Sequence, residues 1–205
     1  MAGTPVGSAE EMITIVSGLP RSGTSLMMQM LAAGGLEPLT DGKRMADASN
    51  PRGYFEWERA KSLPRYPESI ADAEGKVVKI ISTLLLSLPN ARLYKVIFME
   101  RQLAEVTASQ AAMIQNLGTS GPALSPDAMQ RALDAHLKQV KAALRSRPEL
   151  NVLWVPYQDT LMNARSVGER IQQFLGVPLN VSAMAAQVDP ALYRQRHADL
   201  HFSEV

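Results

Sequence analysis

Short apolar runs alternate with longer amphipathic stretches along most of the chain. Four runs have the length and composition of buried strands: residues 13–17, 76–81, 94–99 and 152–156. Four stretches have helical periodicity: residues 25–33, 103–117, 127–145 and 164–175. Apolar strands that alternate with amphipathic helices favour a parallel sheet with helices on both faces. We therefore predict one three-layer α/β domain over residues 1–205, with less order in residues 1–11 and about 190–205.

Turn residues delimit several of these elements. Ser125, followed by Pro126, gives a start to the third predicted helix, and Pro148 ends it. Gly176 ends the fourth helix in the same way. Two stretches rich in Gly, Pro, Asp, Asn and Ser, residues 41–52 and 119–125, are predicted to be irregular, and the second to be mobile.

The turn after the first predicted strand, residues 18–25 (GLPRSGTS), has the features of a phosphate-binding loop. Nucleoside triphosphatases use G-x-x-x-x-G-K-[ST], in which the Lys reaches the β- and γ-phosphates. Here Thr24 takes the place of that Lys, and the loop carries Arg21 instead. Backbone N–H groups and the helix N-terminus still favour a bound anion. Without the Lys, the loop is not expected to support ATP or GTP hydrolysis. The alternative is a tight turn without a ligand, in which Thr24 or Ser25 caps the helix.

Composition narrows the classes of function. The chain has 21 Lys and Arg against 20 Asp and Glu, so its charge gives no support for nucleic-acid binding. It has no cysteine, which excludes disulfides, thiolate–zinc sites and a cysteine nucleophile. The sequence contains no signal-peptide pattern and no apolar run long enough for a membrane span. We expect a cytoplasmic protein.

Polar residues follow three of the predicted strands. They are Arg21 with Ser22, Glu100 with Arg101, and Tyr157 with Asp159. Ligands of open α/β sheets bind beyond the carboxyl ends of the strands, so these residues outline one predicted cleft. Solvated loop residues would give the same pattern.

Three motifs, in order, resemble those of sulfotransferases that use 3′-phosphoadenylyl sulfate (PAPS). Residues 15–26 (IVSGLPRSGTSL) resemble the 5′-phosphosulfate loop in its P-R-S-G-T form, typical of bacterial members and of protein-tyrosine sulfotransferases. Residues 96–101 (VIFMER) followed by Ser109 resemble the 3′-phosphate motif. Residues 155–159 (VPYQD), followed by 174–176 (FLG), resemble the late strand, turn and helix.

The resemblance implies a P-loop fold, PAPS as donor and adenosine 3′,5′-bisphosphate (PAP) as product, with no metal. The sulfuryl group would go to a hydroxyl or amine of a small-molecule, carbohydrate, lipid or peptide acceptor, and a homodimer is compatible. Sulfuryl transfer needs cationic groups beside the oxygens of the transferred group, and the Arg21 guanidinium suits this role. The donor-binding residues that the resemblance implies are Pro20, Arg21, Ser22, Gly23, Thr24, Ser25, Arg101, Ser109 and Tyr157.

The general base is harder to place. Cytosolic sulfotransferases carry a catalytic His two residues after a Lys on an early strand; here Lys79 is present, but Ile81 takes the His position. Lys79 is expected to stabilise the bridging oxygen, the alternative being a strand-edge Lys with its charge in water. The three histidines, which lie in a predicted helix and in the tail, are poorly placed: His136, His197 and His201.

Protein-tyrosine sulfotransferases use a Glu, and residues 50–56 (NPRGYFE) resemble the corresponding segment of bacterial relatives. We predict Glu56 as the base, with a pKa raised by apolar neighbours such as Phe55 and Trp57. Glu58 is the reserve candidate, and a solvated carboxylate is the alternative for Glu56.

The chain also departs from the family pattern. The late basic-glycine segment that closes over the 3′-phosphate is not recognisable, although Arg194 and Arg196 lie in a segment that could replace it. The chain is shorter than usual, so the acceptor is less defined than the donor. Two other functions stay open: a small-molecule kinase, disfavoured by the missing loop Lys and by the lack of a strand-end acid for Mg²⁺, and a non-catalytic nucleotide-binding protein.

Overall fold

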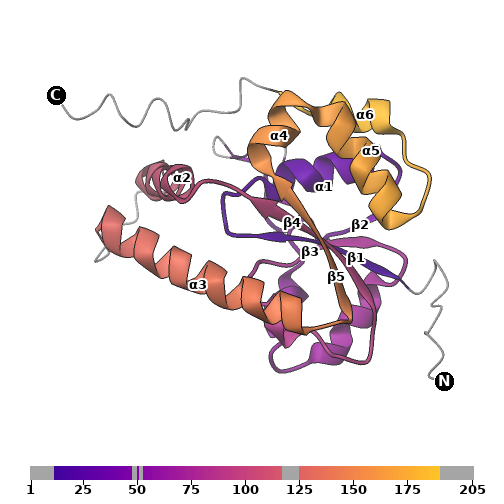
Figure 1. Cartoon of the computed structure of the whole chain (residues 1–205), viewed down its shortest axis with the longest axis horizontal. Helices are drawn as coiled ribbons and strands as arrows, with labels where there is room; N and C mark the ends of the chain where they lie inside the picture. Colours follow the sequence, from indigo (N-terminus) through magenta and orange to yellow (C-terminus); the bar gives the residue numbers. More distant parts are fainter. Residues whose placement is uncertain (1–11, 48–49, 51–52, 117–124, 190–205) are drawn as a thin grey trace.

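The computed structural model describes residues 12–47, 50, 53–116 and 125–189. Within them, five strands form one sheet in the order β2-β3-β1-β4-β5, and all neighbouring strands are parallel (Figure 1). The strands are β1 (Ile13–Gly18), β2 (Pro38–Leu39), β3 (Val77–Lys79), β4 (Tyr94–Glu100) and β5 (Leu150–Pro156). The predicted parallel sheet with flanking helices is confirmed.

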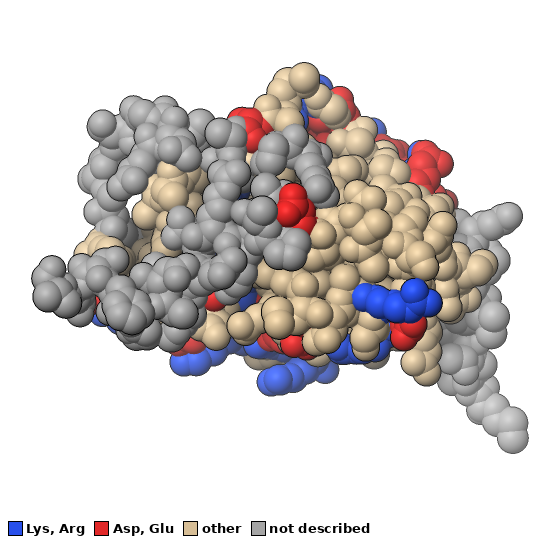
Figure 2. All heavy atoms as spheres, turned by 90° about the horizontal axis from the view of Figure 1, so that it is seen from above, with Lys and Arg blue, Asp and Glu red and all other residues tan. Residues whose placement is uncertain are grey.

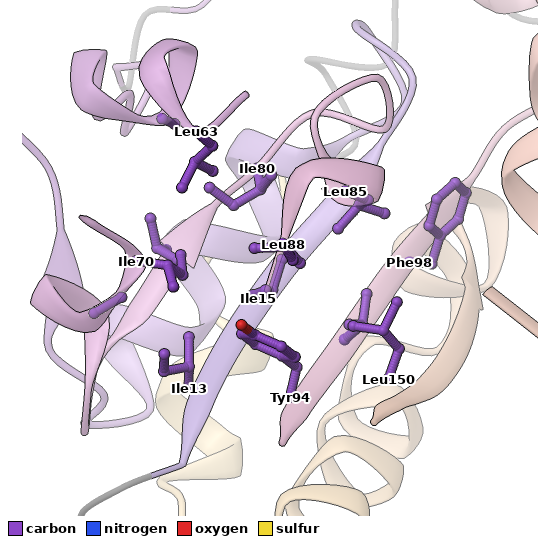
Figure 3. Packing of buried hydrophobic residues seen from close by; sticks show 14 of the residues in the cluster. Ile13, Ile15, Leu63, Ile70, Ile80, Leu85, Leu88, Tyr94, Phe98 and Leu150 are labelled. Carbon is purple, nitrogen blue, oxygen red and sulfur yellow. The ribbon is translucent and has the colours of Figure 1, made fainter. Parts of the chain in front are cut away.

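Side chains alternate between the two faces of this sheet, as the period of two along a strand requires. Ile13 and Ile15 of β1 and Phe98 of β4 point to one face, where they pack with buried leucines and isoleucines (Figure 3). This face is covered by η1 (Glu58–Ser62), η2 (Pro67–Ala73), η3 (Leu85–Ser87) and α3 (Pro126–Ser146).

The opposite face has its own core. Val16, Ile97 and Met99 pack there with methionines and leucines of the covering helices. In Figure 1 these helices lie on the other side of the sheet from α3: α1 (Thr24–Ala33), α4 (Tyr157–Met162), α5 (Ala164–Leu175) and α6 (Val181–Ala185). Two cores on the two faces of one sheet give the predicted three layers.

The predicted helix boundaries agree well with the structure. The backbone N–H of Ala128 donates to the Ser125 hydroxyl at 3.3 Å, which caps α3. Gly176 ends α5 in the left-handed conformation (φ 72°). The helix after β4, α2, covers Leu103–Asn116.

Other predictions need correction. The strand predicted at residues 76–81 is only Val77–Lys79, the two-residue edge strand β2 was not predicted, and α4 begins directly where a polar turn was expected. These elements are too short for a hydrophobic period to develop. Three segments with predictions lie outside the described residues: 1–11, 117–124, and 190–205 with Arg194 and Arg196.

Candidate active site

A cleft of about 540 Å³ opens at the carboxyl edge of the sheet. Parallel strands deliver their following loops to this edge, so residues distant in sequence meet there. Its lining includes every predicted site residue except Ser22: Pro20, Arg21, Gly23, Thr24, Ser25, Glu56, Lys79, Arg101, Ser109 and Tyr157.

The phosphate-binding loop joins β1 to α1 through a strained turn. Arg21 has a left-handed backbone (φ 69°), which is uncommon for a residue with a side chain. Gly23 (φ 98°) could not be replaced without conflict, because a Cβ atom there would lie 2.3 Å from Cδ2 of Tyr157. The N-cap of α1 is Gly23 itself, and no side chain of the described chain caps this helix. The predicted alternative of a capping Thr24 or Ser25 is therefore wrong, and the first N–H groups of α1 are open to solvent or to a ligand.

Contacts to the loop join the first two sequence motifs. The Nε of Arg21 donates to the Ser109 hydroxyl of α2 at 3.0 Å. Arg101, just after β4, donates from Nη1 to the Arg21 carbonyl at 3.0 Å and from Nε to Glu105 at 2.8 Å. The Arg101 guanidinium also lies over the Tyr157 ring, 4.7 Å from its centroid. Burial raises the pKa of the Tyr157 phenol, so its ring is neutral at physiological pH.

Ser22 differs from its loop neighbours. Its side chain is buried, and the residue lines a separate cavity of about 60 Å³ together with Leu19 and Phe98. Its backbone N–H donates to the Leu19 carbonyl at 3.1 Å, which closes the turn. The position of Ser22 thus favours support of the loop over contact with a ligand in the main cleft.

Lys79 ends β3 with its side chain only 6 % exposed. Its ammonium group donates to the Tyr54 carbonyl and lies 3.9 Å from a Glu56 carboxylate oxygen. Burial lowers the pKa of Lys79 to about 8, although the nearby Glu56 charge opposes the shift. The alternative of a strand-edge Lys with its charge in water is therefore wrong.

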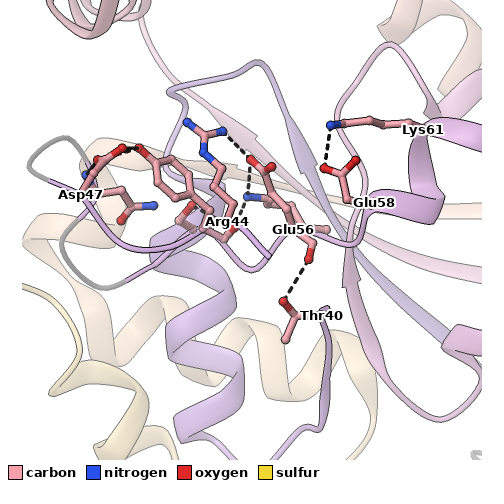
Figure 4. A network of polar contacts seen from close by, with 10 residues as sticks. Thr40, Arg44, Asp47, Glu56, Glu58 and Lys61 are labelled. Atoms are coloured by element: carbon pink, nitrogen blue, oxygen red, sulfur yellow. Dashed lines mark hydrogen bonds and ion pairs between the residues drawn. The ribbon is translucent and has the colours of Figure 1, made fainter. Parts of the chain in front are cut away.

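Glu56 lies between two cations rather than among apolar groups. Its carboxylate pairs with the Arg44 guanidinium at 2.7 Å (Figure 4), and the Lys79 ammonium lies 3.9 Å from a carboxylate oxygen. Phe55 has a left-handed backbone (φ 52°) and packs against one core, whereas Trp57 belongs to the other. The contacts of the Glu56 carboxylate are with the two cations, so the expected apolar surroundings are not found.

The remaining candidates for the base have other partners or lie outside the described residues. Glu58 lines the same cleft, but its carboxylate pairs with Lys61 at 2.7 Å (Figure 4). His136 on α3 contacts the Ser82 hydroxyl at 2.9 Å and is not part of the cleft lining. His197 and His201 lie outside the described residues.

Sequence reasoning missed several cleft residues. Arg44 lies in an irregular stretch, and its guanidinium stacks 3.5 Å from the centroid of the Tyr54 ring. The cleft also has an apolar wall formed by Trp57, Ile81, Leu84 and Met113. Sequence signals lay only near some of them: Tyr54 belongs to the resembling segment 50–56, Trp57 follows Glu56, and Ile81 takes the position of the expected His. Arg44, Leu84 and Met113 belong to none of the three motifs.

Comparison with known proteins shows the class of enzyme. A family model described as "Sulfotransferase domain" matches residues 12–195, and the chain belongs to this family. Membership confirms the predicted activity: the chain is a sulfotransferase that transfers a sulfuryl group from PAPS. No curated protein sequence matches the chain.

Solved structures share the fold at low sequence identity. The sulfotransferase domain of the Synechococcus PCC 7002 olefin synthase is 16 % identical, with a TM-score of 0.53, and the alignment covers 99 % of this chain and 87 % of that domain. The sulfotransferase domain from the curacin biosynthetic pathway is 17 % identical (TM-score 0.51, coverage 86 % and 77 %). A retinol dehydratase in complex with androsterone and the inactive cofactor PAP is 18 % identical (TM-score 0.50, coverage 85 % and 62 %).

The described residues add three observations on partners. They include no group of three or more acidic or His side chains arranged to hold a metal ion. None of the helices within the described ranges is long and apolar enough to cross a membrane. The face seen in Figure 2 is mostly uncharged where it is described, and its Lys and Arg side chains lie chiefly at one edge.

Proposed function

We propose that residues 18–25 and the N-terminus of α1 hold the 5′-phosphosulfate of PAPS, with Arg21 on the sulfuryl oxygens. An uncapped helix N-terminus supplies backbone N–H donors and positive potential to an anion. Arg21 adds a fixed fork of donors on the same side of the cleft. Thr24 and Ser25, which line the cleft, supply hydroxyl donors.

The 3′-phosphate is assigned to Arg101 and Ser109. The observation that supports this best is the chain of contacts from Ser109 through Arg21 to Arg101, because it joins two motifs about 80 residues apart within one cleft. Tyr157, stacked on Arg101 and packed against Gly23, is assigned to the adenosine side of the donor.

The same geometry assigns roles for group transfer. An acceptor oxygen attacks sulfur as the bond from sulfur to the 5′-phosphate oxygen breaks, and PAP leaves. Glu56 takes the acceptor proton, and Lys79, buried and positively charged at neutral pH, stabilises the leaving oxygen. Arg44 holds the Glu56 carboxylate at the cleft.

The acceptor is proposed to be a hydroxyl or amine on a largely apolar body. Trp57, Ile81, Leu84 and Met113 form an apolar wall of the cleft that Glu56 also lines, and Ile81 is 37 % exposed despite its apolar side chain. The charged residues nearby are already paired, Arg44 with Glu56 and Lys61 with Glu58. A carbohydrate would need more polar partners than this wall supplies. A cytoplasmic location and a homodimer stay predictions.

Donor binding tests the assignment directly. Isothermal titration of the full chain with PAP, adenosine 5′-phosphate (AMP) and ATP-Mg should show a clear preference for PAP. Arg101→Ala should remove most of that preference, because the 3′-phosphate loses its cation. Equal affinity of the parent for PAP and AMP would refute the 3′-phosphate site, and preference for ATP-Mg would favour a kinase.

The base is tested with two matched substitutions two residues apart. Glu56→Gln removes the proton acceptor while keeping the shape, so turnover should fall by about 10²–10⁴-fold with PAP affinity nearly unchanged. Glu58→Gln, whose carboxylate pairs with Lys61, should stay active. The reverse result would move the role to Glu58, and two active variants would exclude a base from this segment.

A further inference from the structure

Glu105 is a buried acid beside a site that is proposed to hold a doubly phosphorylated nucleotide. It lies in the first turn of α2 and is only 3 % exposed. Its negative charge repels such a ligand, so charge alone would disfavour an acid here. Its function must therefore come from what it holds in place.

Glu105 holds Arg101. The two side chains pair at 2.8 Å between Arg101 Nε and Glu105 Oε2, and they are only 8 % and 4 % exposed. The position suits a carboxylate, because the N-terminus of α2 favours negative charge. Buried pairs of this kind lose little to solvent screening, so the guanidinium is fixed in plane and direction.

Arg101 in turn holds the strained part of the loop. Its Nη1 donates to the carbonyl of Arg21, the residue with the left-handed backbone, and its plane lies over Tyr157. Ser109 lies four residues after Glu105, hence on the same face of α2, and accepts from Arg21 Nε. One face of one helix therefore orients both donor-site arginines.

We propose that Glu105 is a positioning residue that sets the preference for 3′-phosphorylated over unphosphorylated adenosine nucleotides. It orients the Arg101 guanidinium before the ligand arrives, so less side-chain freedom is lost on binding. The proposal depends on the assignment of Arg101 to the 3′-phosphate made above.

The test compares PAP and AMP affinities of the full chain by isothermal titration. Glu105→Ala should reduce the PAP-to-AMP preference by about tenfold or more, as loss of orienting partners does at metal sites. Glu105→Gln should keep the preference within about threefold, because its amide oxygen still accepts from Arg101 Nε. Glu169→Ala is the matched control: Arg165 and Glu169 have the same order and spacing on α5, at 3.3 Å and largely exposed, and the preference should not change.

The outcomes separate the two proposals. If the parent itself does not prefer PAP, the 3′-phosphate assignment fails. If the parent prefers PAP and Glu105→Ala retains the full preference, with or without a lower melting temperature, the positioning role of Glu105 is refuted. If Glu105→Ala does not fold, Glu105→Asp takes its place, because the shorter side chain withdraws the carboxylate from Arg101. A reduced PAP-to-AMP preference in this variant supports the proposal, and a preference equal to that of the parent overturns it.

Discussion

The buried position of Lys79 predicts that activity and stability change in opposite directions at mildly alkaline pH. Lys79 is proposed to stabilise the leaving oxygen only while it is protonated. Burial lowers its pKa from 10.5 to about 8 in the folded protein. Raising the pH through this value therefore removes the charge on which the proposed role depends.

The magnitudes follow from that shift. Near pH 7 about nine-tenths of Lys79 is protonated, and near pH 9 about one-tenth, so kcat/KM for PAPS should fall by about tenfold. Stability should rise over the same interval, because the unfolded chain, with its normal Lys pKa, binds more protons than the folded one. The whole shift corresponds to about 3 kcal/mol, gained between about pH 8 and pH 10.5.

The assay measures kcat/KM with an aliphatic alcohol acceptor, which does not itself titrate in this range. Urea denaturation at the same pH values gives the free energy of unfolding. Measurements should stay below about pH 9.5. Burial raises the pKa of Tyr94 to about 12, so at higher pH the unfolded chain loses a tyrosine proton that the folded protein keeps, and this favours unfolding. Lys79→Arg, whose charge persists, is the control, and its profile should be flat even if its activity is lower.

Two results would refute this reasoning. A parent kcat/KM that is constant from about pH 7 to pH 9.5 would show that the charge of Lys79 does not matter. The same alkaline decrease in Lys79→Arg would assign the titration to another group. A fall in stability together with activity would instead indicate alkaline unfolding, and not the loss of one catalytic charge.

Three further substitutions probe the loop and the acceptor wall. Arg21→Ala should weaken PAPS binding and turnover with little change in melting temperature, and unaffected turnover would remove Arg21 from the mechanism. Gly23→Ala should abolish donor binding and destabilise the protein by about 1–3 kcal/mol, because its Cβ would meet the Tyr157 ring at 2.3 Å. A variant that binds PAP as tightly as the parent protein would contradict this. Ile81→Ser should raise KM for an apolar alcohol or phenol several-fold while the Kd for PAP stays constant, and an unchanged KM would place the acceptor elsewhere.

The layers of the fold could be predicted because the spacing of apolar residues indicates which segments form strands and which form helices. Strands that are buried on both faces are mostly apolar, as in β1 and β4, and long helices such as α5 show their period clearly. β2, α4 and the 3₁₀ helices are short and were not predicted, and they form because the surrounding chain packs on them. No local pattern marks them.

The site was predictable to the extent that its residues belong to local motifs. Arg21, Arg101 and Ser109 have fixed places relative to a strand end, and they line one cleft. The surroundings of Glu56 were predicted wrongly, since neighbours in sequence were taken as neighbours in space. The left-handed turn at Phe55 sends adjacent side chains in different directions, and the Arg44 that contacts Glu56 is twelve residues away.

The order of the strands has a consequence for how the protein folds. β1 pairs with β3 and β4, whose residues are more than 60 positions away, as in the registers Thr14↔Val77 and Ile13↔Tyr94. Such pairings between distant segments form late and slowly, because a long loop must close before they form. The donor cleft lies where these strands end, so no single segment of the chain can form the cleft before the strands have paired. In refolding, PAP binding should therefore return in the same kinetic phase as the complete sheet.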